Sequence, residues 1–146
     1  MKEDAYHMRR NWSDENQIQL VLYQYKFGNQ WSKMIGLFPS KTANNLKNQF
    51  FSIVRRCIRK ICRKINAHEY LPKIGNLKST TLSTFFNILC EKTKALNNDA
   101  IDEETIREML NFAFDNKSSI NYLNKMSNRQ ILKDTFVSTI ILEFIH

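Results

Sequence analysis

The stretch TANNLKNQFFSIVRRCIRKICRKI, residues 42–65, decides the fold of this chain because it carries two opposite patterns at once. Apolar residues recur along it every three or four positions, which is the spacing of a helix with one side in a core. They are Leu46, Phe50, Ile53, Cys57, Ile61 and Ile65. The same stretch holds seven basic residues and no acidic one. We therefore predict a long helix, capped by Thr42 or Ser40, with one apolar and one cationic side.

The cationic side of this helix has two interpretations. Its members are Lys47, Arg55, Arg56, Arg59, Lys60, Arg63 and Lys64. A run of charges is most often a solvated surface. Like charges without an acidic neighbour repel one another on a free helix, however, and the phosphates of a nucleic acid relieve that repulsion. We favour a helix that packs on one side and meets phosphate on the other.

Two shorter helices are predicted before the long one. Ser13 is a good N-cap for a helix over residues 14–27, and Gly28 supplies a left-handed stop. The expected buried stripe of that helix is Ile18, Val21, Leu22 and Tyr25. A second helix of about two turns is expected over residues 30–37, ended by Pro39. Trp12 and Trp31 are expected to join Phe50 in the core.

Charge divides the chain into unequal parts. Residues 1–66 carry a net charge of +9 and residues 67–146 a net charge of −1. This asymmetry predicts that one half meets a polyanion while the other has a different task. We expect a DNA-binding domain over residues 9–66, a linker over 67–79 and a helical region over 80–146.

Three further amphipathic helices are predicted in residues 80–146. The first covers residues 81–96, and the second begins at the acidic residues 102–104. The last begins with a capping box formed by Ser127 and Gln130, with a possible short helix over 120–125 before it. Its apolar stripe is Leu132, Phe136, Ile140 and Phe144. These helices either dock a protein partner or pack on the long helix to complete one core, and both alternatives stay open.

Several functional classes are disfavoured by composition. The chain has three cysteines and three histidines, without metal-ligand or disulfide spacing, so we expect buried reduced thiols and no metal or cofactor. No apolar stretch approaches the roughly 20 residues of a membrane span. No phosphate loop, nucleophile elbow or paired-carboxylate motif is present, so we expect an intracellular protein that is not an enzyme.

The first half resembles a single Myb/SANT repeat, a homeodomain-like fold of three helices built on spaced aromatic residues. The resemblance covers residues 9–56 and rests on Trp12, Gly28, Trp31 and Phe50, with Phe50 in place of the usual third Trp. The segment FPSKTANNLKNQF also fits, with Lys41 and Thr42 standing for the usual Arg-Thr. The resemblance implies an all-α fold whose third helix, here extended, enters the DNA major groove.

The resemblance also implies which residues contact DNA. In Myb repeats a Lys-Asn pair before the third aromatic reads base edges, and here this pair is Lys47 and Asn48. Asn44 and Asn45 are expected to take part of this task, because Phe51 stands where many members carry another Asn. We expect phosphate contacts from the rest of the set, which is Lys41, Arg55, Arg56, Arg59, Lys60 and Arg63.

The sequence therefore predicts a nuclear, non-catalytic protein that binds double-stranded DNA and meets other protein subunits through residues 80–146. Its size, Asn- and Lys-rich composition and homeodomain-like pattern resemble the small accessory subunit of a protist DNA N6-adenine methyltransferase complex. The main alternative is a SANT-type module that binds histone tails or proteins and that would bury or neutralise the cations of the third helix. A structural bundle with a merely solubilising basic face is the third reading.

Overall fold

The computed structural model describes residues 12–97, 101–114 and 129–145 of the chain. Within these ranges every regular element is helical, so the predicted all-α class is confirmed. Seven α-helices are found there, joined by short 3-10 turns and one π segment. None of the described helices is long and apolar enough to cross a membrane.

Helix α2 (Asp14–Phe27) begins and ends as predicted. The Ser13 hydroxyl accepts a hydrogen bond of 3.1 Å from the Asn16 backbone N–H, and Gly28 ends the helix with φ of 76°. The buried stripe is shifted, however, because Gln17, Leu20 and Gln24 join Ile18 and Val21 inside. The predicted core residues Leu22 and Tyr25 are only half-buried. The apolar spacing thus predicted the helix correctly, but the buried side lies about one residue earlier in the sequence than predicted.

The second helix is shorter than expected. Helix α3 spans only Trp31–Met34 and passes into a 3-10 turn, η1 (Ile35–Leu37). Gln30 provides no side-chain cap at the start of α3. The ring of Trp12 packs on that of Phe38 just after η1, at a centroid distance of 6.0 Å. This contact draws the chain before α2 toward the turn that leads to the long helix.

Helix α4 (Ala43–Lys64) is the predicted long helix, and its 22 residues make it about 33 Å long. Thr42 is the cap: its hydroxyl accepts from the Asn45 N–H at 3.0 Å, and its own N–H donates to the Asn45 side-chain oxygen at 3.1 Å. At the far end Asn66 adopts φ of 61°, and the Ala67 N–H donates to the Cys62 carbonyl at 2.8 Å. This bond and the left-handed conformation of Asn66 form a Schellman-type end, which fixes where α4 stops.

Replacing Thr42 with Ala is expected to destabilise the protein by about 1 kcal/mol, because it removes the hydroxyl that accepts the hydrogen bond from the Asn45 N–H. Thermal or urea unfolding of the two proteins measures the difference. Thr42→Ser keeps the hydroxyl and should behave like the parent. An unchanged midpoint for the Ala variant would show that the Thr42 hydroxyl contributes nothing to the stability of α4.

The second half of the chain surrounds the later turns of α4. The segment expected as a linker contains a 3-10 helix, η2 (His68–Asn76), which packs on α4. It is followed by α5 (Ser79–Asn97) and α6 (Glu103–Ala113). The chain then forms α8 (Arg129–Phe136), the π segment η4 (Val137–Ile141) and α9 (Leu142–Ile145). The expected short helix at 120–125 and the capping role of Ser127 fall outside the described residues.

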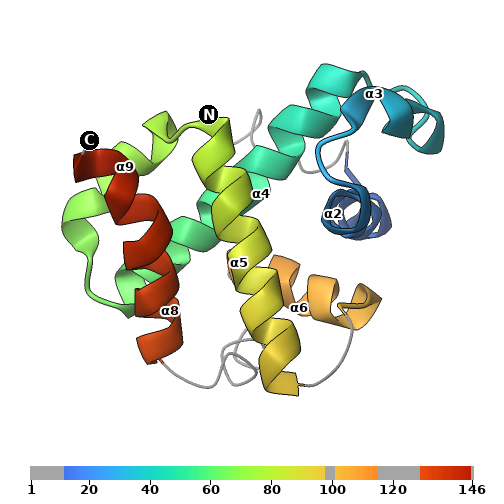
Figure 1. Cartoon of the computed structure of the whole chain (residues 1–146). Helices are drawn as coiled ribbons and strands as arrows, with labels where there is room; N and C mark the ends of the chain where they lie inside the picture. Colours follow the sequence, from blue (N-terminus) through green and yellow to red (C-terminus); the bar gives the residue numbers. More distant parts are fainter. Residues whose placement is uncertain (1–11, 98–100, 115–128, 146) are drawn as a thin grey trace.

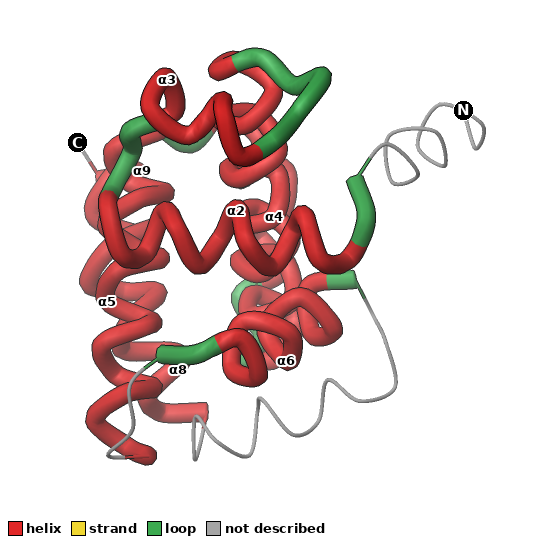
Figure 2. The backbone as a smooth tube through the Cα atoms, turned by 90° about the vertical axis from the view of Figure 1, so that its right-hand side faces the viewer, coloured by secondary structure: helices red, strands yellow, loops and turns green. Residues whose placement is uncertain are grey.

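Helix α4 is the central element of the core. Figure 1 shows it running diagonally behind α5, with α2 and α3 near one end and α8 and α9 near the other. In the turned view of Figure 2, α2 crosses in front of α4 and α6 lies beside both. Phe50 is fully buried and contacts the ring of Trp31 at 5.5 Å and that of Phe86 in α5 at 5.1 Å. The buried residues of the two halves therefore meet at Phe50.

The buried side of α4 is wider than the predicted single stripe. Leu46, Phe50, Ile53, Cys57 and Ile61 are buried as expected, while Ile65 is only half-buried. A second buried row runs beside them, formed by Phe51, Val54, Ile58 and Cys62. The second row is buried because η2, α5, α6 and α8 all pack on α4.

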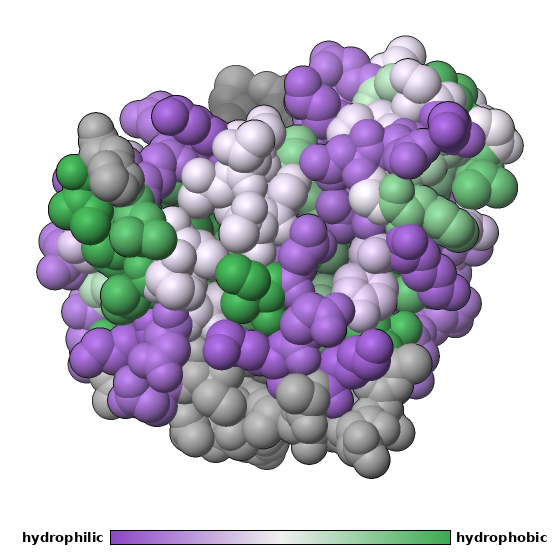
Figure 3. Space-filling model, in the orientation of Figure 1, coloured by the Kyte–Doolittle hydropathy of each residue, from purple (hydrophilic) through white to green (hydrophobic). Residues whose placement is uncertain are grey.

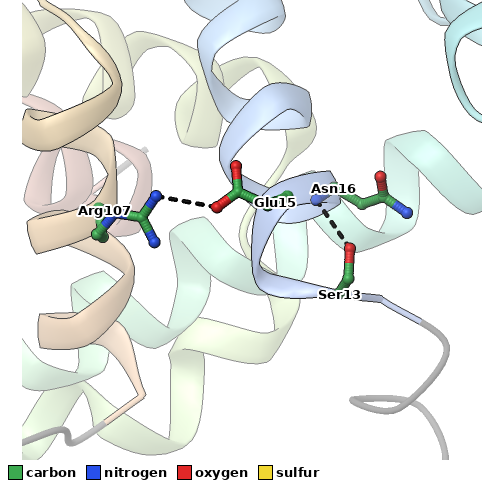
Figure 4. A network of polar contacts seen from close by, with 4 residues as sticks. All are labelled: Ser13, Glu15, Asn16 and Arg107. Atoms are coloured by element: carbon green, nitrogen blue, oxygen red, sulfur yellow. Dashed lines mark hydrogen bonds and ion pairs between the residues drawn. The ribbon is translucent and has the colours of Figure 1, made fainter.

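Polar contacts also join the two halves at the surface. Arg107 in α6 donates to the Glu15 carboxylate in α2 at 3.0 Å, next to the capped start of α2 (Figure 4). The side chains are 40% and 62% exposed, so solvent screening leaves this ion pair with little effect on stability. The Tyr25 hydroxyl donates to Glu91 of α5 at 3.1 Å. The apolar contacts at Phe50 therefore hold the halves together more strongly than these surface bonds.

Candidate nucleic-acid interface

The first two turns of α4 present polar side chains to solvent. Asn44, Lys47 and Asn48 are exposed, and we call these three residues the recognition face. Their backbone is held by the capping box at Thr42 and by Leu46, which is fully buried one turn in. Asn45 is exposed as well, but its side-chain oxygen already accepts the Thr42 N–H. Of the four residues predicted here, three therefore have side chains directed outward and one helps to cap the helix.

An open groove of about 720 Å³ lies beside the recognition face. The turn between α2 and α3 forms one wall, and the first turns of α4 form the other. Phe27 lines the groove although its side chain is 58% exposed. The remaining lining residues are Gly28, Asn29, Gln30, Trp31, Ser32, Lys33, Ala43, Asn44 and Lys47. Two lysines and no carboxylate line the groove, so its charge favours binding of an anion.

Lys41 precedes α4 and is half-buried rather than extended into solvent. Its ammonium lies 4.7 Å from the centroid of the Trp12 ring, which is a cation–π contact. Lys41, which takes the place of the family's usual Arg, thus covers one edge of the aromatic core. A phosphate contact from Lys41 stays a prediction.

The cations in the middle of α4 are engaged with the second half of the chain. Arg55 is half-buried, and its Nη2 donates to the Leu77 carbonyl at 3.3 Å. The Arg56 guanidinium lies 4.8 Å from the centroid of the Phe114 ring. Arg59 lies beside Gly75 of η2: a Cβ atom at this glycine would be 3.9 Å from the Arg59 Nη2. These arginines cover apolar and backbone surface with their long side chains.

The last turns of α4 carry a more exposed set of cations. Arg63 and Lys64 are exposed and Lys60 is half-buried, and we call these three residues the terminal patch. Partial burial lowers the pKa of Lys60 from its ordinary value, and the positive charges of Lys64 and Arg63 lower it further. The three side chains are therefore close enough to repel one another.

Lys47 and Arg63 lie on different sides of α4, whereas Asn48, Arg55, Arg59 and Arg63 follow one side of it, with Ser52 between the first two. Arg63 lies sixteen positions after Lys47, which places the two residues about 24 Å apart along the axis and about 160° apart around it. The positions that continue the side of Lys47 are Phe51, Val54 and Ile58, all buried. A ligand that meets Lys47 therefore reaches only the first two turns of α4 on that side.

Sequence reasoning missed two residues of this region. Lys33 and Phe27 both line the groove. The sequence contained a signal for Phe27, because it lies off the apolar stripe of its helix and directly before the Gly28 stop. No pattern in the sequence indicated that Lys33 would lie across the groove from Lys47.

Other chemistry has little support in the described structure. Cys57, Cys62 and Cys90 are free and buried, and burial raises the pKa of the Cys57 thiol to about 12 and that of Cys62 to about 11. Such thiols stay protonated and unreactive near neutral pH. Among residues 12–97, 101–114 and 129–145, no group of His, Cys, Asp and Glu is arranged to hold a metal ion.

Comparison with known proteins gives one match, to the first part of the chain. The family model of the Myb-like DNA-binding domain matches residues 9–54, roughly a third of the chain, and the match ends within α4. Curated proteins and solved structures gave no match. Trp12, Trp31 and Phe50, the capped start of α4 and the recognition face all lie in the matched segment. The chain therefore carries a Myb-like DNA-binding domain at residues 9–54.

Proposed function

We propose that this protein binds double-stranded DNA by placing the recognition face in the major groove. The observation that carries the proposal is the exposure of Lys47 between two exposed asparagines, on a helix whose opposite side is anchored in the core. A lysine ammonium can donate to the O6 and N7 atoms of guanine, and an Asn amide can pair with the N6/N7 edge of adenine. The groove beside Lys47, with Lys33 on its far wall, offers room for the flanking phosphates.

The SANT-type alternative predicts that the cations of the third helix are buried or neutralised. Arg55 and Lys60 are half-buried, but Lys47 at the recognition face is exposed. Exposure of this residue favours DNA over a histone tail, because histone tails are themselves basic and a lysine on the reading surface would repel them.

Anisotropy titrations with a labelled duplex and with a labelled histone-tail peptide test the two functions side by side. The proposal predicts saturable binding of the duplex and none of the peptide. Binding of the peptide alone would contradict it and support the SANT-type function.

We further propose that the protein acts in the nucleus as a non-catalytic accessory subunit, and that a DNA N6-adenine methyltransferase is the enzyme it serves. The sequence resemblance stated above supports this assignment. A single Myb-like domain makes few base contacts, so a larger assembly would raise its affinity for DNA. Three exposed apolar side chains at the chain's end, Val137, Leu142 and Ile145, support contact with another subunit through residues 80–146. Figure 3 shows hydrophobic surface over α9, the helix that carries Leu142 and Ile145.

Reconstitution with a purified DNA N6-adenine methyltransferase tests this context. The chain is expected to raise methylation of a duplex at limiting DNA concentration and to have no methylation activity alone. Methylation that does not change when the chain is added would contradict the proposed context but not the binding of DNA.

A further inference from the structure

The last helical run that the structure describes contains a widened turn. Helices α8 and α9 form one continuous run in Figure 1, and the π segment η4 lies between them. A single π turn inserts one residue into an α-helix, so every later position is turned back by about 100° relative to a straight helix. The hydroxyls of Ser138 and Thr139 both donate to the Thr135 carbonyl, at 3.2 Å and 2.6 Å. Such bonds from hydroxyls to the helix backbone favour a local bend.

The inserted residue brings three exposed apolar side chains onto one row. Val137, Leu142 and Ile145 are 47%, 47% and 68% exposed, and we call them the outer stripe. In a straight helix Leu142 would lie about 140° and Ile145 about 80° from Val137 around the axis. The π turn reduces these angles to about 40° and about 20°. Residues spaced i, i+5 and i+8 in the sequence thereby occupy the places i, i+4 and i+7, which form the apolar stripe of an amphipathic helix.

Contacts on the other sides of this helix hold the outer stripe toward solvent. Phe136 is buried, and its ring lies 5.8 Å from that of Tyr70 in η2. The Phe144 ring stacks on the same tyrosine at 5.6 Å. The Glu143 carboxylate accepts the Lys78 backbone N–H at the start of α5, at 3.1 Å and 3.3 Å from its two oxygens. The outer stripe is therefore a preformed apolar surface on a helix fixed by its neighbours.

The rim of the outer stripe beside α9 is cationic. Lys73 and Lys78 are exposed, and the Lys73 ammonium lies 5.4 Å from the centroid of the phenyl ring in α9. Glu143 is the acidic residue of α9, and its carboxylate already binds the Lys78 N–H. In α8 the exposed Lys133 and Asp134 balance each other in charge. An acidic surface suits this rim, whereas a second copy of the chain, with its own net charge of +8, is repelled.

From this geometry we propose that the outer stripe docks an amphipathic helix of a partner protein, in which carboxylates flank the apolar stripe. This docking rests on the proposed contact with another subunit and defines the chemistry of that contact. The apolar stripes of the two helices bury each other, while the partner's carboxylates meet Lys73 and Lys78. Figure 1 shows α9 near one end of α4, and the recognition face lies at the other end. DNA and the partner helix can therefore be bound at the same time.

Three synthetic peptides test the docking on the full chain. The probe is a labelled, stapled helix of about four turns, with Leu at heptad positions a and d and Glu at the flanking positions. A second peptide carries Lys in place of every Glu. A third has the composition of the probe, but its leucines are placed so that they form no stripe. Binding is measured by fluorescence anisotropy.

Three variants of the chain locate the binding. The stripe variant carries Leu142→Gln and Ile145→Gln. The control variant carries Ile35→Gln and Leu37→Gln, which change two exposed apolar residues of η1 instead. The rim variant, with Lys73→Gln and Lys78→Gln, keeps the outer stripe and so tests the charge independently of it. Thermal unfolding, sedimentation velocity and binding of a labelled duplex are measured in parallel for the parent and all variants.

The parent and the control variant are expected to bind the probe and to prefer it to the other two peptides. The stripe variant is expected to bind it at least about tenfold more weakly, with unchanged unfolding and duplex binding, because its apolar contacts are lost. The rim variant is expected to lose the preference for Glu over Lys at the flanks.

No binding of the probe by the parent overturns the docking. Equal binding of the peptide without a stripe also overturns it, as does an equal loss in the stripe and control variants, because binding would then follow charge or composition. Dimerisation of the parent that the stripe variant abolishes would assign the surface to a second copy and overturn it too. Absence of duplex binding by the parent would instead contradict the proposed binding of DNA, which the peptide measurements do not involve.

Discussion

A double variant with Lys47→Glu and Asn48→Ala is expected to bind a duplex at least about tenfold more weakly than the parent. Each good base contact contributes about 1–3 kcal/mol to the free energy of binding. The substitution also places a negative charge where the recognition face meets DNA. Both side chains are exposed, so the midpoint of thermal unfolding should change little. Anisotropy titration and a thermal melt on the same samples measure the two effects.

A matched control separates position from charge. Lys94 and Asn87 are both exposed on α5 and do not belong to the recognition face, and Lys94→Glu with Asn87→Ala makes the same chemical change. This control should lose only a small part of the affinity through the change in net charge. Equal losses in the two variants would show that DNA binding depends on total charge and not on the recognition face. Parent-like binding by the Lys47 variant would contradict the predicted docking.

Replacing Phe50 with Ala is expected to destabilise the protein by about 3–5 kcal/mol, since a fully buried aromatic ring is removed from the centre of the core. Phe50 contacts Trp31 and Phe51 on one side and Phe86 of α5 on the other. The cavity would therefore loosen both halves of the chain at once. Urea unfolding followed by tryptophan fluorescence and by far-UV circular dichroism measures the loss.

The two probes also test the predicted division into residues 9–66 and 80–146. Trp12 and Trp31 both lie in the first half, whereas circular dichroism reports all helices. The packing at Phe50 predicts coincident transitions, with both shifted by the substitution. Two separate transitions, with only the fluorescence transition shifted, would support independent domains. Phe27→Ala is the control, because that side chain is 58% exposed and its loss should be nearly neutral.

Helix positions were predictable because their signals are local. Ser13, Gly28 and Thr42 act on the backbone next to them, so both ends of α2 and the start of α4 follow from the sequence. The family resemblance at residues 9–54 was predictable for a similar reason, since the aromatic spacing reflects one compact three-helix unit.

The contact partners of the arginines on α4 were not predictable from the sequence. A helical wheel shows that Arg55 and Arg56 lie outside the apolar side of α4. It does not show that Arg55 contacts the Leu77 carbonyl or that Arg56 contacts the Phe114 ring. These contacts depend on where η2 and α6 pack, which is set by tertiary fit. The second buried row of α4 escaped prediction for the same reason. Phe51 and Ile58 indicate a second apolar side only once a further layer of helices is known to cover it.

Contact between α4 and phosphate is the central claim, and a salt series of duplex binding tests it most directly. The association constant is measured by anisotropy for the full chain over about 50–200 mM salt. The account predicts that its logarithm falls linearly with the logarithm of the salt concentration, with a slope of about −0.9 for each phosphate neutralised. A slope near zero would contradict the claim, because binding would then release no counterions and the cations of α4 would not contact the DNA backbone.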